Sequence, residues 1–147
     1  MILLGIDLGK VRTGISVCDP SEVLATPVAV IRATQREKLL SEIQALAVAH
    51  RAEGFVVGLP LNMDGSAGES ARNARAFAQE LESLVSLPVF LQDERGTTVT
   101  AHGFLSETNT RGKKRKEKVD AAAAAIILQN HLEMRRLARE REKQRGE

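Results

Sequence analysis

Short apolar runs alternate with longer amphipathic stretches along the chain. Residues 2–7 and 13–18 are apolar runs separated by a turn that contains Gly9, which predicts a β-hairpin. Residues 35–50 and 69–85 instead carry apolar side chains at the spacing of an amphipathic helix. The full pattern predicts strands at 2–7, 13–18, 27–31, 54–59 and 88–92, and helices at 35–50, 69–85, 97–105 and 119–137.

The order of these elements predicts an α/β fold, with a mixed β-sheet that begins with an antiparallel hairpin and carries helices on both faces. The last helix is apolar all round at its start, so its first half should be buried. We predict a single domain over residues 1–138, a charged C-terminal tail over 139–147, and connecting loops at 61–68 and 106–118. In such sheets, sites form where strand ends and helix starts meet.

The composition is that of an ordinary globular protein. Of the 147 residues, 43% are hydrophobic and 27% charged, which excludes a disordered chain. Cys18 is the single cysteine, so an internal disulfide and a multi-cysteine zinc site are excluded. The apolar start is too short for a signal peptide and no apolar run approaches the roughly 20 residues of a membrane span. We therefore expect a cytoplasmic protein with no membrane partner.

The net charge of +2 says little, but its distribution is uneven. Residues 111–118 hold six basic residues and one acid. Such a cluster is either a solvated loop or a contact for a polyanion. If it is a contact, the candidate substrate-binding residues are Lys113, Lys114, Arg115 and Lys116.

Three places in the chain set a carboxylate beside apolar structure. Asp7 ends the first strand, where desolvation of its charge is costly without a cation. Asp93 and Glu94 follow the last strand, and strand alternation alone does not decide which of them joins Asp7. Asp120 opens a helix whose next eight residues are all apolar. Each acid also has a simpler explanation, as a turn cap or as a first-turn acid that suits the helix dipole.

Taken together, the acids predict a site for a hard divalent cation, Mg²⁺ or Mn²⁺. His50, His102 and His131 stand apart and do not suggest zinc. Such a cation can polarise a phosphoryl oxygen and activate water. Basic residues close to the acids in sequence, Lys10, Arg12 and Arg95, point to a phosphodiester substrate. Because aromatic residues make up only 3%, recognition through the nucleic-acid backbone is more natural than base stacking.

Four segments carry a family resemblance. They are GIDLGKVRTGISV at 5–17, VGLPLNMDG at 57–65, DER at 93–95 followed by Thr97 and Thr98, and KVDAAAAAIIL at 118–128. In this order they resemble the bacterial YqgF family, whose members are called pre-16S rRNA nucleases or Holliday-junction-resolvase-like proteins. The resemblance covers residues 2–132, and it implies an RNase H-like fold.

The resemblance also implies roles for individual residues. Asp7, Glu94 and Asp120 match the acidic metal ligands of the family, which favours Glu94 over Asp93. Arg12, Asn62 and Arg95 match positions expected to meet substrate or brace the site. Gly96 departs from the family pattern, in which leucine is usual, and glycine loosens the start of the helix expected after it. The implied activity is metal-dependent nuclease action in 5′-end maturation of precursor 16S rRNA, and the implied partner is nucleic acid.

Other functions remain open on the sequence. Holliday-junction or branched-DNA resolution is the alternative within the nuclease class, and nothing in the sequence shows a dimer face, so we expect a monomer or weak homodimer. A non-catalytic RNA-binding ribosome-assembly factor could keep the same fold. An ATP-binding protein of the actin and sugar-kinase type is disfavoured, because it needs two such domains and 147 residues supply one.

Overall fold

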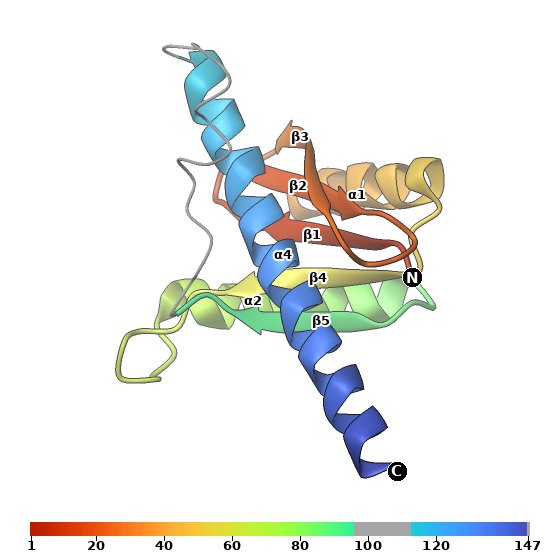
Figure 1. The fold of residues 1–147 in the computed structure, drawn as a ribbon. Helices are drawn as coiled ribbons and strands as arrows, with labels where there is room; N and C mark the ends of the chain where they lie inside the picture. Colours follow the sequence, from red (N-terminus) through yellow and green to blue (C-terminus); the bar gives the residue numbers. More distant parts are fainter. Residues whose placement is uncertain (96–112, 147) are drawn as a thin grey trace.

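The computed structural model describes residues 1–95 and 113–146, and the side chains of 113–120 lie outside that description. Five strands and three helices are described (Figure 1). In chain order they are β1 (Leu3–Asp7), β2 (Arg12–Cys18), β3 (Ala25–Arg32), α1 (Arg36–His50), β4 (Gly54–Leu59), α2 (Glu69–Leu84), β5 (Val89–Asp93) and α4 (Lys113–Arg145).

The strands form one mixed sheet in the order β3-β2-β1-β4-β5. The first three strands are antiparallel neighbours, with Leu4 opposite Val17 in the β1–β2 pair. β1, β4 and β5 are parallel, with Ile6 opposite Val57 and Leu59 opposite Asp93. The carboxyl ends of β1, β4 and β5 therefore meet at one edge of the sheet, and the predicted α/β fold is confirmed.

Helices cover both faces of this sheet. The larger core lies on one face, where Leu39, Leu40 and Ile43 of α1 and Ala74, Phe77 and Leu81 of α2 pack with the sheet. On the other face, α4 crosses the strands diagonally, and its C-terminal end projects beyond the sheet (Figure 1). Its apolar residues Ala125, Ile127, Leu128 and Leu132 form a second core with Leu3 and Val56. The apolar helix predicted from the sequence is thus buried, as expected.

Small residues let α4 approach the sheet closely. A Cβ atom at Gly5 would come within 2.8 Å of the Leu128 Cβ and 2.9 Å of the Ala124 carbonyl oxygen. Beside it, the buried Ser16 hydroxyl donates a hydrogen bond of 2.8 Å to that same carbonyl. A larger residue at position 5 would push the helix outward, so Gly5 and Ser16 fix where α4 lies.

Most predicted elements are confirmed, including the loop at 61–68 and the buried Cys18. The strand predicted at 27–31 is longer, because it extends over Ala25–Arg32. The helix predicted at 97–105, together with Gly96, lies outside the described residues.

The prediction for the last helix was wrong at both ends. It begins at Lys113 rather than at 119 and continues to Arg145 rather than to 137, so residues 113–118 are helical and not part of a loop. Lysine, arginine and glutamate favour helix, and no glycine or proline interrupts the chain between 113 and 145. The helix runs through the predicted boundary at residue 138, and the division into domain and tail stays a prediction.

No helix in the described part of the chain is long and apolar enough to cross a membrane.

Candidate nuclease site at the sheet edge

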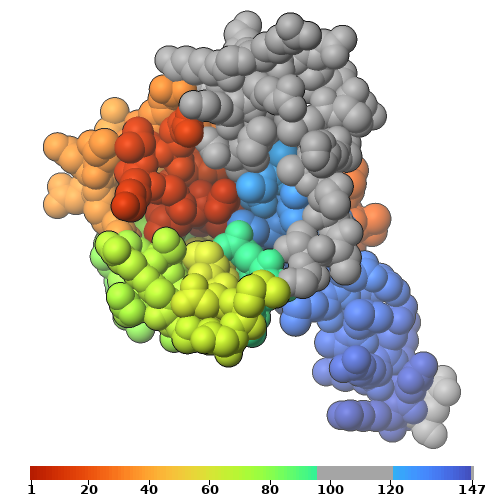
Figure 2. Space-filling view, turned by 90° about the vertical axis from the view of Figure 1, so that its left-hand side faces the viewer, coloured from red at the N-terminus to blue at the C-terminus, as the bar shows by residue number. Residues whose placement is uncertain are grey.

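Two of the three predicted acids meet at the edge where the parallel strands end. Asp7 and Glu94 line one cavity of about 250 Å³. The other residues that line it are Leu8, Gly58, Pro60, Ser70 and Ala74. Figure 2 looks onto this edge, where the red residues after β1, the yellow-green segment before α2 and the green end of β5 gather beside the blue α4. The fold therefore brings together two carboxylates that are 87 positions apart, 94 minus 7, in the sequence.

Strand pleating explains why these two acids share a face. Gly5 faces α4, and Asp7 lies two residues further along β1, so both belong to the same face of the sheet. In β5, Gln92 hydrogen-bonds His131 of α4, and Glu94 lies two residues further. The Glu94 amide donates to the carbonyl of Leu59 at 3.2 Å, which holds residue 94 beside the end of β4.

Gly58 makes room for the Glu94 side chain. A Cβ atom at this position would lie 3.1 Å from the Glu94 carboxyl carbon and 2.5 Å from Ile127 Cδ1 of α4. Any larger residue would displace the Glu94 carboxyl group or the Ile127 side chain. The sequence reasoning did not single out Gly58, although a glycine within an otherwise buried strand is a recognised signal of close approach.

Asp93 does not line this cavity but pairs with Arg95. Its carboxylate accepts hydrogen bonds from the Arg95 side chain, at 2.8 Å from Nη2 and 3.0 Å from Nε, and from the Arg95 backbone amide at 2.9 Å. These bonds hold the pKa of Asp93 below its usual value. Asp93 is therefore engaged with its neighbour, while Glu94 lines the cavity with Asp7.

Arg95 also contacts the loop that precedes α2. Its Nη1 donates to the Met63 carbonyl at 3.4 Å and lies 3.2 Å from where a Cβ of Gly65 would be. Gly65 has φ of +89°, a backbone conformation that favours glycine. In the same loop, Asn62 Nδ2 donates to Ser66 Oγ at 3.0 Å. Asn62 and Arg95 thus both hold the shape of the loop that precedes α2.

Burial raises the pKa of Glu94, and the nearby charge of Asp93 raises it further. The surroundings thus disfavour its ionised form. Perturbed carboxyl groups of this kind cluster at functional sites, although structural networks also produce them. A carboxylate in this setting gains from a cation that binds next to it.

The third acid, Asp120, lies in α4 one turn before Ala124, the residue whose carbonyl is bonded to Ser16. Its side chain is outside the described part of the chain. Among the side chains that are described, no group of three or more His, Cys, Asp or Glu could hold a metal ion. The helix backbone is therefore fixed near this edge, and the three-acid metal site stays a prediction.

The predicted basic residues are placed unevenly. Lys10 is exposed in the turn after β1, and Arg12 is half-buried at the start of β2. Lys113, Lys114, Arg115 and Lys116 form the first turns of α4, but their side chains lie outside the description. His131 is buried against β5, where burial lowers its pKa to about 4, and His102 lies outside the described residues.

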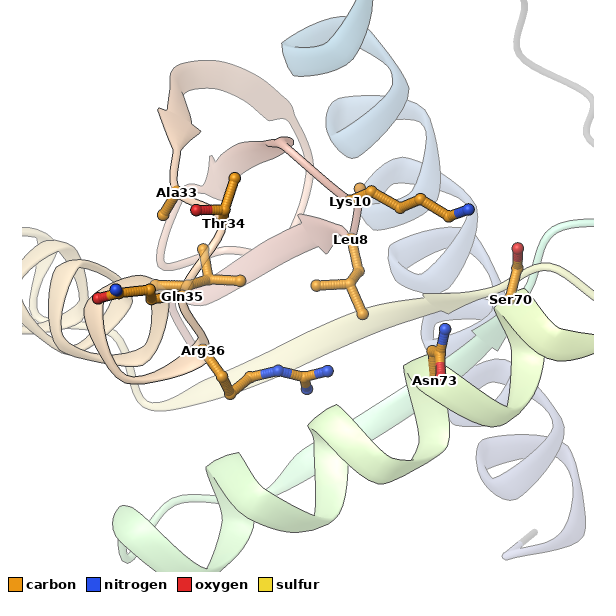
Figure 3. A pocket seen from close by; sticks show the side chains of 10 residues that line it. Leu8, Lys10, Ala33, Thr34, Gln35, Arg36, Ser70 and Asn73 are labelled. Atoms are coloured by element: carbon orange, nitrogen blue, oxygen red, sulfur yellow. The ribbon is translucent and has the colours of Figure 1, made fainter.

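Sequence reasoning missed a second cavity of about 360 Å³. Its walls include Lys10, Arg36, Ser70 and Asn73, and it shares Leu8 and Ser70 with the cavity of Asp7 and Glu94 (Figure 3). Ser70 and Asn73 are three residues apart on α2, and Arg36 opens α1. Their shared position at helix starts above the sheet edge was the available signal.

Comparison with known proteins identifies relatives over almost the whole chain. The family model RuvX, described as Holliday junction resolvase, matches residues 1–134. A relative from an Anaeromyxobacter species carries the name pre-16S rRNA nuclease and is 45% identical over 135 residues. The match covers 92% of this chain and 98% of that protein. A relative of the same name from a Roseiflexus species is 37% identical over 134 residues, covering 91% and 95%.

Solved structures share the fold at much lower identity. RuvC from Thermus thermophilus in complex with a Holliday junction substrate superposes with a TM-score of 0.59 at 15% identity, covering 92% of this chain and 96% of that one. The yeast mitochondrial Holliday junction resolvase Ydc2 gives 0.52 at 12% identity, covering 88% and 77%. The RNase H-like arrangement expected from the sequence is thus confirmed.

Proposed function

The chain belongs to the RuvX family of Holliday-junction-resolvase-like nucleases, and from this membership we propose that it is a divalent-metal-dependent nuclease that matures the 5′ end of precursor 16S rRNA in the cytoplasm. The observation that carries the proposal is the cavity shared by Asp7 and Glu94 at the carboxyl ends of β1, β4 and β5. Two acids converge there from separate strands, beside the helix that contains Asp120.

The chemistry of these donors fits Mg²⁺ or Mn²⁺. Asp7, Glu94 and Asp120 would hold the ion, because carboxylate oxygens are the ligands that hard divalent cations prefer. The raised pKa of Glu94 agrees with this, since a nearby cation would offset the cost of its charge. When bound, such an ion supplies charge neutralisation at the phosphoryl group and makes a water molecule a better nucleophile.

The remaining residues bind and orient the strand. Lys10, in the turn that follows β1, and Arg12, at the start of β2, would hold phosphates next to the scissile one. Lys113, Lys114, Arg115 and Lys116 would contact the backbone further along. Arg95 and Asn62 act on the loop at 62–66 and keep its shape next to Glu94. Hydrolysis then breaks one P–O bond, water adds to phosphorus, and the departing oxygen takes a proton.

The substrate assignment follows the relatives. The two described above carry the name of pre-16S rRNA nuclease and are 45% and 37% identical. The family model instead carries the description Holliday junction resolvase, which makes branched DNA the second candidate.

The test is cleavage of labelled precursor 16S RNA and of a four-way DNA junction, with Mg²⁺ or Mn²⁺ and with chelator. The key variant is Asp7→Asn, and Asp19→Asn is a matched control, because Asp19 lies in the turn after β2 at the opposite edge of the sheet. We expect metal-dependent cleavage of the RNA by the wild type and by Asp19→Asn, and loss of more than about 100-fold in Asp7→Asn.

Other results would change the assignment in defined ways. Faster cleavage of the junction than of the RNA would make the protein a resolvase. Binding of RNA by the wild type without any cleavage would indicate a non-catalytic assembly factor. Full activity of Asp7→Asn would remove the cavity of Asp7 and Glu94 from the mechanism.

A further inference from the structure

The second cavity, of about 360 Å³, opens next to the cavity of Asp7 and Glu94. The two have Leu8 and Ser70 as lining residues in common, so they lie side by side at this edge of the sheet. Leu8, Ala33 and Leu39 supply an apolar part, and no acidic residue lines it within the described chain. A volume of this size accommodates a small ligand or one unit of a polymer.

Arg36 supplies a hydrogen-bond donor that the described protein leaves unused. Its Nη1 atom is buried and has no hydrogen-bond partner within the described part of the chain. The closest acid oxygen, Glu80 Oε1, lies at 3.9 Å, which allows an ion pair but no hydrogen bond. The guanidinium lies 5.2 Å from the centre of the Phe77 ring, and this contact holds it in place.

Other groups around the cavity can also donate hydrogen bonds to an anion. In Figure 3, Arg36 extends from the start of α1 toward Asn73 on α2, while Lys10 extends toward Ser70. The start of α1 adds backbone amides, because Gln35 makes no side-chain capping bond and the first helical bond described runs from the Leu39 amide to Gln35. Two cations, two side-chain amides, two hydroxyls and an open helix start therefore surround one cavity, and no acid of the described chain lines it.

We propose that this cavity binds the phosphate and sugar of a nucleotide that flanks the scissile phosphate, with Arg36 as the residue that contacts the flanking phosphate. Arginine suits this task because its planar guanidinium pairs with phosphate oxygens. Leu8 and Leu39 give the sugar an apolar wall. This inference rests on the proposed nuclease function, and it adds Arg36, Ser70 and Asn73 to the residues that position the strand.

The experiment pairs one protein variant with a phosphate scan. Arg36→Met keeps an unbranched apolar side chain against Phe77 but removes the charge and the donors. Arg75→Met is the matched control, since Arg75 is exposed on α2 and lines neither cavity. The probe is a labelled RNA with the sequence of the precursor 16S 5′ end, in which one phosphate at a time is a neutral methylphosphonate. Binding is measured in chelator, so that no cleavage occurs.

We expect the wild type to bind about tenfold more weakly when a single phosphate next to the cleavage position is neutral. Arg36→Met should bind the unmodified RNA about tenfold more weakly and show no further loss at that same phosphate. Its dependence on salt should also fall by about one unit of log K per unit of log salt, as for one lost phosphate contact. Arg75→Met should match the wild type in all three measurements.

The alternative outcomes separate the two proposals. If the wild type cleaves the RNA but Arg36→Met shows the wild-type affinity and the same phosphate profile, the subsite is wrong and the nuclease function stands. If the wild type neither binds nor cleaves nucleic acid, both proposals fall. Should Arg36→Met melt well below the wild type, Asn73→Ala replaces it, and an unchanged profile at the flanking phosphate in that variant overturns the subsite.

Discussion

Two glutamates at opposite edges of the same sheet show how differently one fold can treat a carboxylate. Glu22, in the turn after β2, has a side chain that is only 9% exposed. It accepts hydrogen bonds from Arg135 at 2.5 Å, from Arg139 at 3.1 Å and from the N-terminal amine at 3.3 Å. These partners, Arg135 above all, lower the pKa of Glu22 to about 2. The charge of this acid therefore stabilises the fold.

Glu94 shows the opposite behaviour. Burial raises its pKa, and Asp93 adds to the effect, so that the folded protein disfavours its charge. Both acids lie beside α4, Glu22 against its charged half and Glu94 next to its apolar half. An acid that costs stability when ionised, placed in a cavity with a second acid, is typical of a functional site. The comparison thus separates an acid that holds α4 in place, Glu22, from an acid that we propose takes part in the chemistry, Glu94.

The largest expected difference between the two acids is in cleavage. Glu94→Gln should reduce metal-dependent RNA cleavage by more than about 100-fold, because it removes a charged oxygen from the proposed metal site. Glu22→Gln should cleave within about threefold of the wild type at a temperature where it is folded. Glu82→Gln, an exposed change on α2, controls for loss of one negative charge. Comparable activity of Glu94→Gln and Glu82→Gln would contradict a role of Glu94 in cleavage.

For stability, we expect the larger loss in Glu22→Gln and not in Glu94→Gln. Glu22→Gln should lower the free energy of unfolding by about 2 kcal/mol at pH 7, because a pKa near 2 instead of 4.5 favours the ionised acid in the folded state. This contribution is complete above about pH 5 and is lost as the pH falls through 4.5 toward 2. Urea titrations at pH 7 and pH 3 measure it.

The control for that titration is Glu140→Gln. Glu140 pairs with Arg136 at 2.7 Å, but its side chain is 55% exposed, so we expect a loss below about 0.5 kcal/mol. Equal losses of unfolding free energy in the two variants at pH 7 would show that the bonds of Glu22 to Arg135 and Arg139 do not hold α4 in place.

A third substitution tests whether the hydrogen bond between Ser16 and α4 positions the proposed site. Ser16→Ala removes the 2.8 Å hydrogen bond to the Ala124 carbonyl and should cost about 1 kcal/mol. Because this bond lies one turn from Asp120, cleavage should also fall severalfold. Ser83→Ala, at an exposed hydroxyl bonded to the Glu80 carbonyl, should change neither. A stability loss with unaltered cleavage would mean that the Ser16 bond does not position the site.

The smallest expected effect concerns how the free energy of unfolding depends on pH. Glu94 should change it in the direction opposite to Glu22, because its pKa is raised and not lowered. In chelator, a raised Glu94 pKa means that the folded state holds its proton longer than the unfolded state. Its contribution therefore falls as the pH rises from the usual glutamate value through the raised one. Glu94→Gln should then be slightly more stable than the wild type at pH 7 to 8 in chelator, and added Mg²⁺ should stabilise only the wild type. A less stable Glu94→Gln in chelator would contradict the raised pKa.

Local pattern alone predicted most elements of the fold. The short apolar runs at 2–7 and 54–59 indicated buried strands, and the longer apolar start at 119–128 indicated a buried helix, because exposure of such surface is costly. The basic residues at 113–118 were misjudged because charge pattern reports on solvation, while helix propensity decided the backbone. The acids at strand ends were visible for the same local reason, as charges after apolar runs.

The tertiary structure decided which of these charges meet. Residue spacing left Asp93 and Glu94 equivalent, and the family resemblance favoured Glu94. The structure gives the physical reason, because Glu94 lines the cavity while Asp93 pairs with Arg95. Arg36, Ser70 and Asn73 come from two helices, and they surround one cavity only because both helices pack on the sheet. Sequence thus determined the elements and the candidate acids, because both follow from local hydrophobicity. The packing of distant segments determined the two cavities, because a cavity exists only between them.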